Sequence, residues 1–178
     1  MKKRTLWILC ASLFVFAIAA DLITKSWAET ALSGGRVIPV LGNWLVFCFT
    51  VNTGGAFGSL AGSNVLFFIV TLIGLPAFGF WLYRSSKEGS VLNCISITMI
   101  LAGALGNAYD RAFLGDGFFN GAVRDFISVS GFSVFNVADS FLTVGVILLM
   151  FGVFFWNKDA LIPLRKNRGE NDGNGEGN

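Results

Sequence analysis

The chain has 178 residues, of which 54% are hydrophobic and 13% charged, and its mean hydropathy is +0.67. A soluble domain carries about twice that share of charged residues, and the long apolar runs are typical of a polytopic α-helical membrane protein. Histidine is absent, which excludes Ser-His and Cys-His catalysis and imidazole-dependent metal sites. The three cysteines have no metal-ligand spacing, so we expect no metal and no cofactor. No basic patch with interleaved aromatic residues indicates nucleic-acid binding.

The first apolar run follows the basic segment Met1–Arg4. From about Leu6 to Ala20 it fits a cleavable signal peptide with a small-residue end. Extended over about residues 5–27, it fits a retained transmembrane helix instead. In the second interpretation Asp21 and Lys25 lie one helical turn apart and can pair. The local sequence leaves both interpretations open.

The segment of about residues 33–63 has a different composition. Two runs, around 36–40 and 44–51, are rich in β-branched and aromatic residues and are separated by Gly, Pro and Asn. This pattern predicts a small sheet on the outer membrane face, between the first and second spans. The sheet should end in the turn NTGGAF, where Gly54 permits either close approach to a ligand or a plain hairpin loop.

Three more spans are predicted at about 64–83, 91–112 and 137–156. The last two are joined by an outer loop at about 113–135, which is rich in glycine and aromatic residues. Residues 1–157 should therefore form one four-helix membrane domain. The polar tail, 158–178, has the composition of a disordered cytoplasmic segment.

The distribution of basic residues predicts the orientation of the spans. With both termini in the cytoplasm, the cytoplasmic side holds nine Lys and Arg residues and the outer side holds four. The cytoplasmic set is Lys2, Lys3, Arg4, Arg84, Lys87, Lys158, Arg165, Lys166 and Arg168, and the outer set is Lys25, Arg36, Arg111 and Arg124. This orientation brings the polar residues near the span ends to the outer membrane boundary.

Helical spacing groups these polar residues further. Asn107 and Arg111 share one face of the third span, and Asn136 and Asp139 share one face at the start of the fourth. Asp125 lies in the connecting segment, fourteen residues before Asp139. Two carboxylates in contact share a proton, so one can act as a general base on water while the other polarises a carbonyl group.

Other interpretations of these carboxylates remain open on the residues alone. Asp125 and Asp139 also fit a buried pair with arginine, or a proton or cation path in a small transporter or channel subunit. Against a transporter, the polar residues gather at one face and not along a midplane path. Asp110 precedes Arg111, and we expect Asp110 to be a partner in a structural ion pair.

Five segments resemble, in order and spacing, the motifs of bacterial lipoprotein signal peptidase (signal peptidase II): DLITK at 21–25, VNTGGAFG at 51–58, GALGNAYDR at 103–111, VRDF at 123–126 and FNVADS at 135–140. The resemblance covers roughly residues 5–157. It implies a four-span aspartic endopeptidase of the bacterial cytoplasmic (inner) membrane. This family cleaves diacylglyceryl-modified prolipoproteins before the lipidated cysteine. Membrane lipid and a globomycin-like cyclic peptide inhibitor are further implied partners.

The resemblance also implies roles for individual residues, which fall into a catalytic pair, a substrate-binding set and a supporting set. These are Asp125 and Asp139 as the catalytic dyad; Asn52, Gly54, Asn107, Arg111 and Asn136 for substrate binding and dyad orientation; and Asp21 and Lys25 as support for the fold around the site.

The chain departs from the family pattern at two positions. Gly55 stands where alanine is usual, and this smaller residue should be tolerated. Arg124 stands immediately before Asp125, where an apolar residue is often found. We expect its guanidinium group to point toward headgroups or solvent.

Overall fold

The computed structural model describes residues 2–53, 64–115 and 121–156. The order of elements is α1 (Lys3–Leu32), β1 (Val37–Leu41), β2 (Leu45–Asn52), α2 (Asn64–Glu88), α3 (Val91–Phe113), β3 (Val123–Val129) and α4 (Val137–Phe151), followed by a π-helical turn over Gly152–Trp156. The expected cytoplasmic tail and Gly54 lie outside the described residues.

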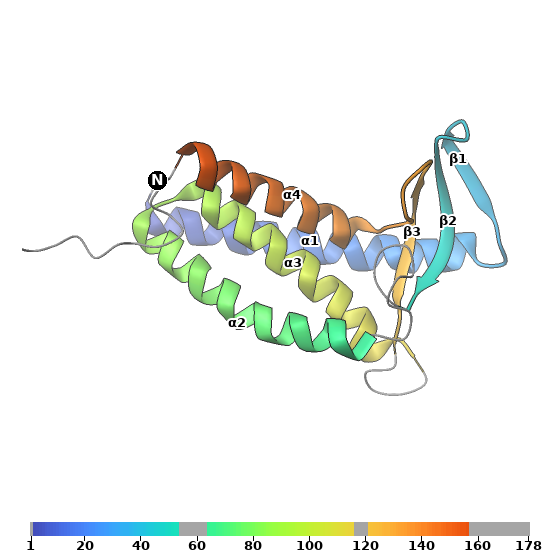
Figure 1. Cartoon of the computed structure of the whole chain (residues 1–178), viewed down its shortest axis with the longest axis horizontal. Coiled ribbons are helices and arrows are strands. Elements are labelled where there is room, and N and C mark those ends of the chain that lie inside the picture. Colours follow the sequence, from blue (N-terminus) through green and yellow to red (C-terminus); the bar gives the residue numbers. More distant parts are fainter. Residues whose placement is uncertain (1, 54–63, 116–120, 157–178) are drawn as a thin grey trace, which may run out of the picture.

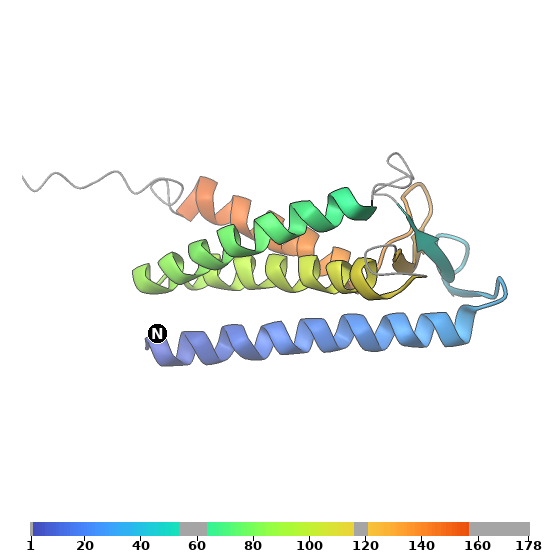
Figure 2. The same cartoon turned by 90° about the horizontal axis from the view of Figure 1, so that it is seen from below.

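Four helices in the described residues are long and apolar enough to cross a membrane. They lie side by side, with the sheet at one end (Figure 1). The predicted class, an all-α polytopic membrane protein with a small sheet, is therefore confirmed. The first helix is longer than the predicted span: α1 has 30 residues, or about 45 Å at 1.5 Å per residue, against a hydrocarbon core of about 30 Å. Its C-terminal part extends beyond the other helices and lies against the sheet (Figure 2).

Helix α3 is the centre of the bundle, and it contacts each of the other three helices. Glycines allow this close packing. A Cβ atom at Gly103 would meet the carbonyl oxygen of Ala138 in α4, and one at Gly145 of α4 would lie 2.8 Å from the carbonyl oxygen of Ser96. Small residues at helix contacts are the usual way in which membrane helices approach each other.

The sheet has three antiparallel strands in the order β1-β2-β3. Strands β1 and β2 match the two predicted runs between the first two spans. Strand β3 comes from the 113–135 segment, which the sequence predicted as an outer loop, and it pairs with β2 so that Thr50 is opposite Asp125. The prediction missed this strand because its first four residues are all buried, which removes the alternation of polar and apolar residues that marks a half-exposed strand.

An apolar cluster fixes the sheet to the projecting part of α1. Ala28, Leu32 and Phe126 form its buried centre. The ring of Trp27 meets the rings of Phe47 and Phe126 edge-on, at centroid distances of 5.6 and 6.2 Å. Edge-to-face pairs of this kind add to the stabilisation from apolar burial. The strand that carries Asp125 is therefore packed on a rigid helix.

Candidate active site

Asp139 is held in place by the start of its own helix. Asn136 is the N-cap of α4, and its side-chain oxygen accepts a hydrogen bond from the Asp139 backbone N–H at 2.9 Å. In return, Oδ2 of Asp139 accepts from the Asn136 backbone N–H at 3.1 Å. This reciprocal arrangement is a capping box, which satisfies two N–H groups that a helix start leaves unpaired. It fixes one oxygen of the Asp139 carboxylate.

Asp125 reaches the same asparagine from strand β3. Its Oδ1 accepts from Nδ2 of Asn136 at 2.7 Å, and its Oδ2 accepts from Nδ2 of Asn52 at 2.9 Å. The side chain is 1% exposed. Burial raises the pKa of Asp125 to about 6, with the charge of Asp139 adding to the rise and the bonds from Asn52 and Asn136 opposing it. Asn136 therefore contacts both carboxylates.

Asn107 of α3 completes the contacts of Asp139. Its Nδ2 donates to Oδ1 of Asp139 at 2.7 Å. Its own oxygen accepts from Nδ2 of Asn136 and from Nζ of Lys25, each at 3.0 Å. Because both bonds to that oxygen come from donors, the amide is oriented with its NH2 group toward the carboxylate.

The predicted pair of Asp21 and Lys25 is confirmed, with 2.8 Å between Lys25 Nζ and Asp21 Oδ2. Asp21 also accepts a hydrogen bond from the backbone N–H of Ala138 at 2.9 Å. Ala138 lies in the first turn of α4, so α1 supplies a further cap for the helix that carries Asp139.

The expectation for Arg124 is wrong, whereas the expectation that Asp110 takes part in a structural ion pair is confirmed. Arg124 does not point to headgroups or solvent: it is 8% exposed and donates to Asp110 and Glu29. Asp110 pairs with Arg124 at 2.9 Å and with Lys25 at 3.4 Å, and not with Arg111. The adjacent residues of a helix, such as Asp110 and Arg111, point in different directions, which explains why sequence neighbours were poor guides to the ion pair.

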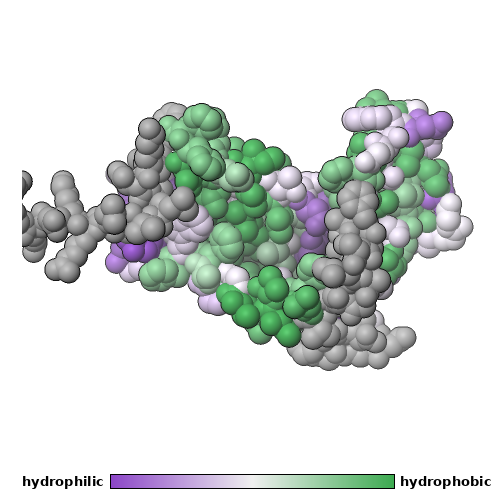
Figure 3. Space-filling model, viewed as in Figure 1, coloured by the Kyte–Doolittle hydropathy of each residue, from purple (hydrophilic) through white to green (hydrophobic). Residues whose placement is uncertain are grey.

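Arg111 lies beside a cleft of about 360 Å³, whose polar lining also includes Asn52, Asn107 and Asp139. NH1 of Arg111 donates to the backbone oxygen of Asn107 at 3.3 Å, and its guanidinium carbon is 5.1 Å from the centroid of the Phe67 ring. Its Nε is buried and has no hydrogen-bond partner among the described residues. Figure 3 shows hydrophilic surface in the hollow between the apolar helices and the sheet.

The apolar part of the cleft comes from α2, α3, α4, strand β3 and the segment before α4. Helix α2 supplies Phe67 and Val70, α4 supplies Leu142, and the segment before α4 supplies Val134 and Phe135. Helices α2 and α4 each pack against α3. Asp139, which is half-buried, lines the cleft, whereas Asp125 is buried and is not among the lining residues. The cleft can thus present one carboxylate to a partly apolar ligand.

The structure brings eight of the nine candidate residues to one end of the helices. One hydrogen-bonded network contains Asp125, Asp139, Asn52, Asn107, Asn136, Lys25, Asp21 and Arg111. Gly54 is outside the described residues. Sequence reasoning missed Arg124 as the partner of Asp110. No local sequence signal identified this contact, because the partners of Arg124 lie on other elements, Asp110 on α3 and Glu29 on α1.

Comparisons with known proteins show the family of the chain. A family model described as signal peptidase (SPase) II matches residues 13–155. The chain belongs to the signal peptidase II family. It is similar to the lipoprotein signal peptidase of Bifidobacterium longum subsp. infantis, with 35% identity over 90% of this chain and 88% of that protein. It is also similar to that of Staphylococcus carnosus, with 33% identity over 91% of this chain and all of that protein.

Solved structures place this signal peptidase II family member among membrane enzymes. A bacterial membrane enzyme structure determined by the in meso method at 2.3 Å resolution has a TM-score of 0.72 and 31% identity, and the match covers 93% of this chain and 94% of that chain. A second, at 1.9 Å resolution, has a TM-score of 0.68 and 32% identity over 83% and 93% of the two chains. The fold is therefore shared with enzymes that work in membranes.

Proposed function

We propose that this protein is an aspartic endopeptidase that removes signal peptides from diacylglyceryl-modified prolipoproteins. Family membership and the name of the relatives, lipoprotein signal peptidase, support the substrate class. The observation that carries the aspartic mechanism is the pair of carboxylates, Asp125 and Asp139, which are joined through Asn136 beside a cleft. The scissile bond is the one before the lipidated cysteine.

Hydrolysis uses the two carboxylates as a coupled pair that shares one proton. The ionised member takes a proton from water as the water oxygen attacks the scissile carbonyl carbon. The protonated member donates a hydrogen bond to the carbonyl oxygen, where negative charge develops. The tetrahedral intermediate then collapses: the C–N bond breaks, and the leaving nitrogen receives a proton from the dyad. A pKa of about 6 for Asp125 suits a group that exchanges a proton near neutral pH.

The substrate binds in the cleft in front of Asp139. Asn52, Asn107 and Arg111 supply polar contacts for the peptide backbone, and the buried Nε of Arg111 is available for one of them. The NTGGAF segment with Gly54 contributes to the same binding. The apolar lining from α2 and α4 suits the acyl chains and the apolar signal peptide of a substrate that remains in the membrane. A globomycin-like cyclic peptide inhibits by occupying this cleft.

The protein resides in the bacterial inner membrane with both termini in the cytoplasm and the site at the outer face. The charge distribution of the sequence supports this orientation. The buried charged side chains of the described residues all belong to the network at the sheet end: Asp21, Lys25, Asp110, Arg111, Arg124 and Asp125. A transporter would need such groups along a path across the membrane, so the peptidase is the better supported function.

The test is cleavage of a diacylglyceryl-modified prolipoprotein by the purified protein in detergent. The wild type should cleave before the lipidated cysteine. Asp125→Asn and Asp139→Asn should each lose about 100- to 10,000-fold in kcat, because each removes a proton-transfer group. Glu88→Gln, which changes a carboxylate that is 48% exposed, should retain full activity. Cleavage by both dyad variants would contradict the aspartic mechanism, and a folded wild type that does not cleave a sound substrate would contradict the peptidase function.

A further inference from the structure

Strand β3 carries two charged side chains in succession, and they make separate sets of contacts. Consecutive side chains of a strand point to opposite faces. Asp125 contacts Asn52 and Asn136, whereas Arg124 contacts Asp110 of α3 and Glu29 of α1. The strand therefore holds a proposed catalytic carboxylate on one side and a buried ion-pair cluster on the other.

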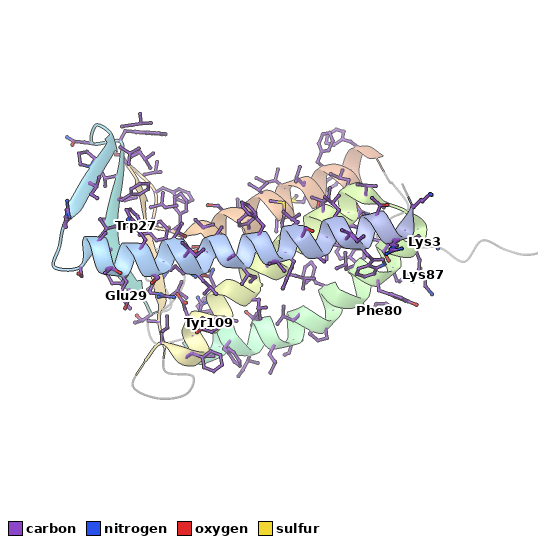
Figure 4. All side chains as sticks on the ribbon, turned by 180° about the vertical axis from the view of Figure 1, so that it is seen from behind. Lys3, Trp27, Glu29, Phe80, Lys87 and Tyr109 are labelled. Atoms are coloured by element: carbon purple, nitrogen blue, oxygen red, sulfur yellow. The ribbon has the colours of Figure 1, made fainter. Side chains whose placement is uncertain are left out.

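The side chain of Arg124 holds the strand against two helices. Its NH2 donates to Oδ1 of Asp110 at 2.9 Å and its Nε to Oδ2 at 3.3 Å, which is a forked arrangement. The backbone N–H of Arg124 donates to the same Oδ2 at 3.1 Å, and NH1 donates to Glu29 at 2.9 Å. Figure 4 shows Glu29 on the part of α1 that lies beside the sheet. Charge-assisted forked bonds are strong and geometrically specific, so they fix the backbone one residue before Asp125.

The carboxylate of Asp110 is also connected to Asp139, the second member of the proposed dyad. Oδ2 of Asp110 lies 3.4 Å from Nζ of Lys25, and that nitrogen donates to Oδ1 of Asn107 at 3.0 Å. Asn107 in turn donates to Asp139 at 2.7 Å. Asp110 is 0% exposed. Asp110, which is outside the proposed dyad, is thus connected by contacts to the strand of Asp125 and to Asp139.

We propose that Arg124 is a positioning residue: by holding β3 against Asp110, it fixes the place of Asp125 relative to Asp139. This inference rests on the proposed peptidase function. Arg124 is not among the residues that line the cleft, so it acts through the strand and not by contact with the substrate. Its loss should therefore change the rate of bond cleavage more than the affinity for substrate. A displacement of about 1 Å in a catalytic group is enough to lower the rate by about 100-fold.

The test compares kcat and KM for prolipoprotein cleavage by wild type and Arg124→Met, which keeps the apolar stem and removes the donors. We expect kcat to fall by about tenfold or more, with KM within about twofold of wild type. Arg124→Lys should be intermediate, because a single ammonium group cannot reproduce the fork. The matched control is Arg84→Met, which removes an exposed ion pair with Glu88 at the other end of the bundle. It should leave both constants unchanged.

A second pair of variants separates positioning from a general loss of fold. Removing Arg124 alone leaves the buried carboxylate of Asp110 with Lys25 as its remaining ion-pair partner, and loss of one partner of a buried ion pair destabilises a protein. The double variant Arg124→Met with Asp110→Asn removes that charge as well. If Arg124 acts through Asp110, the loss of kcat in the double variant should be smaller than the product of the losses in the two single variants, because the two residues form one unit. Multiplying losses would contradict the inference.

Hydrogen exchange of the backbone amides of residues 123–129 supplies a measurement that does not depend on activity. Arg124→Met should speed exchange in this strand, and Arg84→Met should not. A wild-type chain that fails to cleave overturns the proposed function, whereas unchanged exchange in β3 overturns the positioning role whatever the activity. Wild-type kcat in folded Arg124→Met, or a loss of activity that only follows the unfolded fraction, overturns it as well.

Discussion

At the scale of single residues, the candidate catalytic carboxylate of Asp125 lies in an environment that disfavours its ionised form. It is 1% exposed and its pKa is raised to about 6, first by burial. An aspartate in an unfolded chain has a pKa of about 3.9. The native state therefore binds this proton more tightly than the unfolded state does, so Asp125 lowers the stability of the fold as pH rises from about 4 to about 6, and the loss persists above that.

This gives a signed prediction for Asp125→Asn. The variant cannot ionise, so its free energy of unfolding relative to wild type should increase as pH rises from about 4 to about 7, by about 2–3 kcal/mol, and then stay level. Thermal unfolding in detergent at a series of pH values measures this difference. A difference for Asp125→Asn that is independent of pH would contradict the raised pKa.

The residues of the site were predictable to the extent that helical spacing determines them. Asn136 with Asp139, and Asp21 with Lys25, are three or four residues apart, and local geometry alone brings them together. Arg124 was not predictable, because its partners lie on α1 and α3 and no local spacing relates them. The burial of a charge depends on long-range packing, and the periodicity of the sequence does not indicate which distant residues will pack together.

At the scale of elements, the first turn of α4 is the best anchored part of the site. Its free N–H groups are satisfied by the capping box of Asn136 and Asp139 and by Asp21 of α1. The sequence predicted the four spans because each is a long apolar run. It missed β3 as a strand because strand identity here depends on pairing with β2, in a register that includes Asn52 opposite Val123.

Close contact of α3 with α4 leads to a prediction about two glycines. A Cβ atom at Gly103 would meet the backbone of Ala138 and Leu142, whereas one at Gly79 of α2 would meet nothing within 4 Å. Gly103→Ala should therefore destabilise the protein by about 1–3 kcal/mol and lower cleavage activity, because it pushes against the turn that carries Asp139. Gly79→Ala should stay within about 0.5 kcal/mol of wild type.

Thermal unfolding midpoints and cleavage rates of the two alanine variants, measured side by side, check this prediction. Equal stability of Gly103→Ala and Gly79→Ala would show that α4 can move away from α3 without penalty. The contact between these helices would then not be what places Asp139 in the site.

At the scale of the whole molecule, the two ends of the bundle differ in charge chemistry. The sheet end contains the buried network, whereas the other end carries exposed basic side chains. Figure 4 shows Lys3 and Lys87 at one end of the helices and Trp27 and Glu29 at the other. Basic residues favour the cytoplasmic side, so the network should face the outside of the cell, where a translocated substrate arrives.

This orientation can be tested with single cysteines in a Cys48→Ser background, since Cys10 and Cys94 are buried. Arg36→Cys lies in the exposed stretch before β1, and Lys87→Cys lies near the exposed end of α2. In spheroplasts, a membrane-impermeant maleimide should label Arg36→Cys at once and Lys87→Cys only after permeabilisation. The charge asymmetry that predicts this is nine basic residues against four. The reverse labelling pattern would place the carboxylates on the cytoplasmic side and would contradict the proposed position of the site at the outer face.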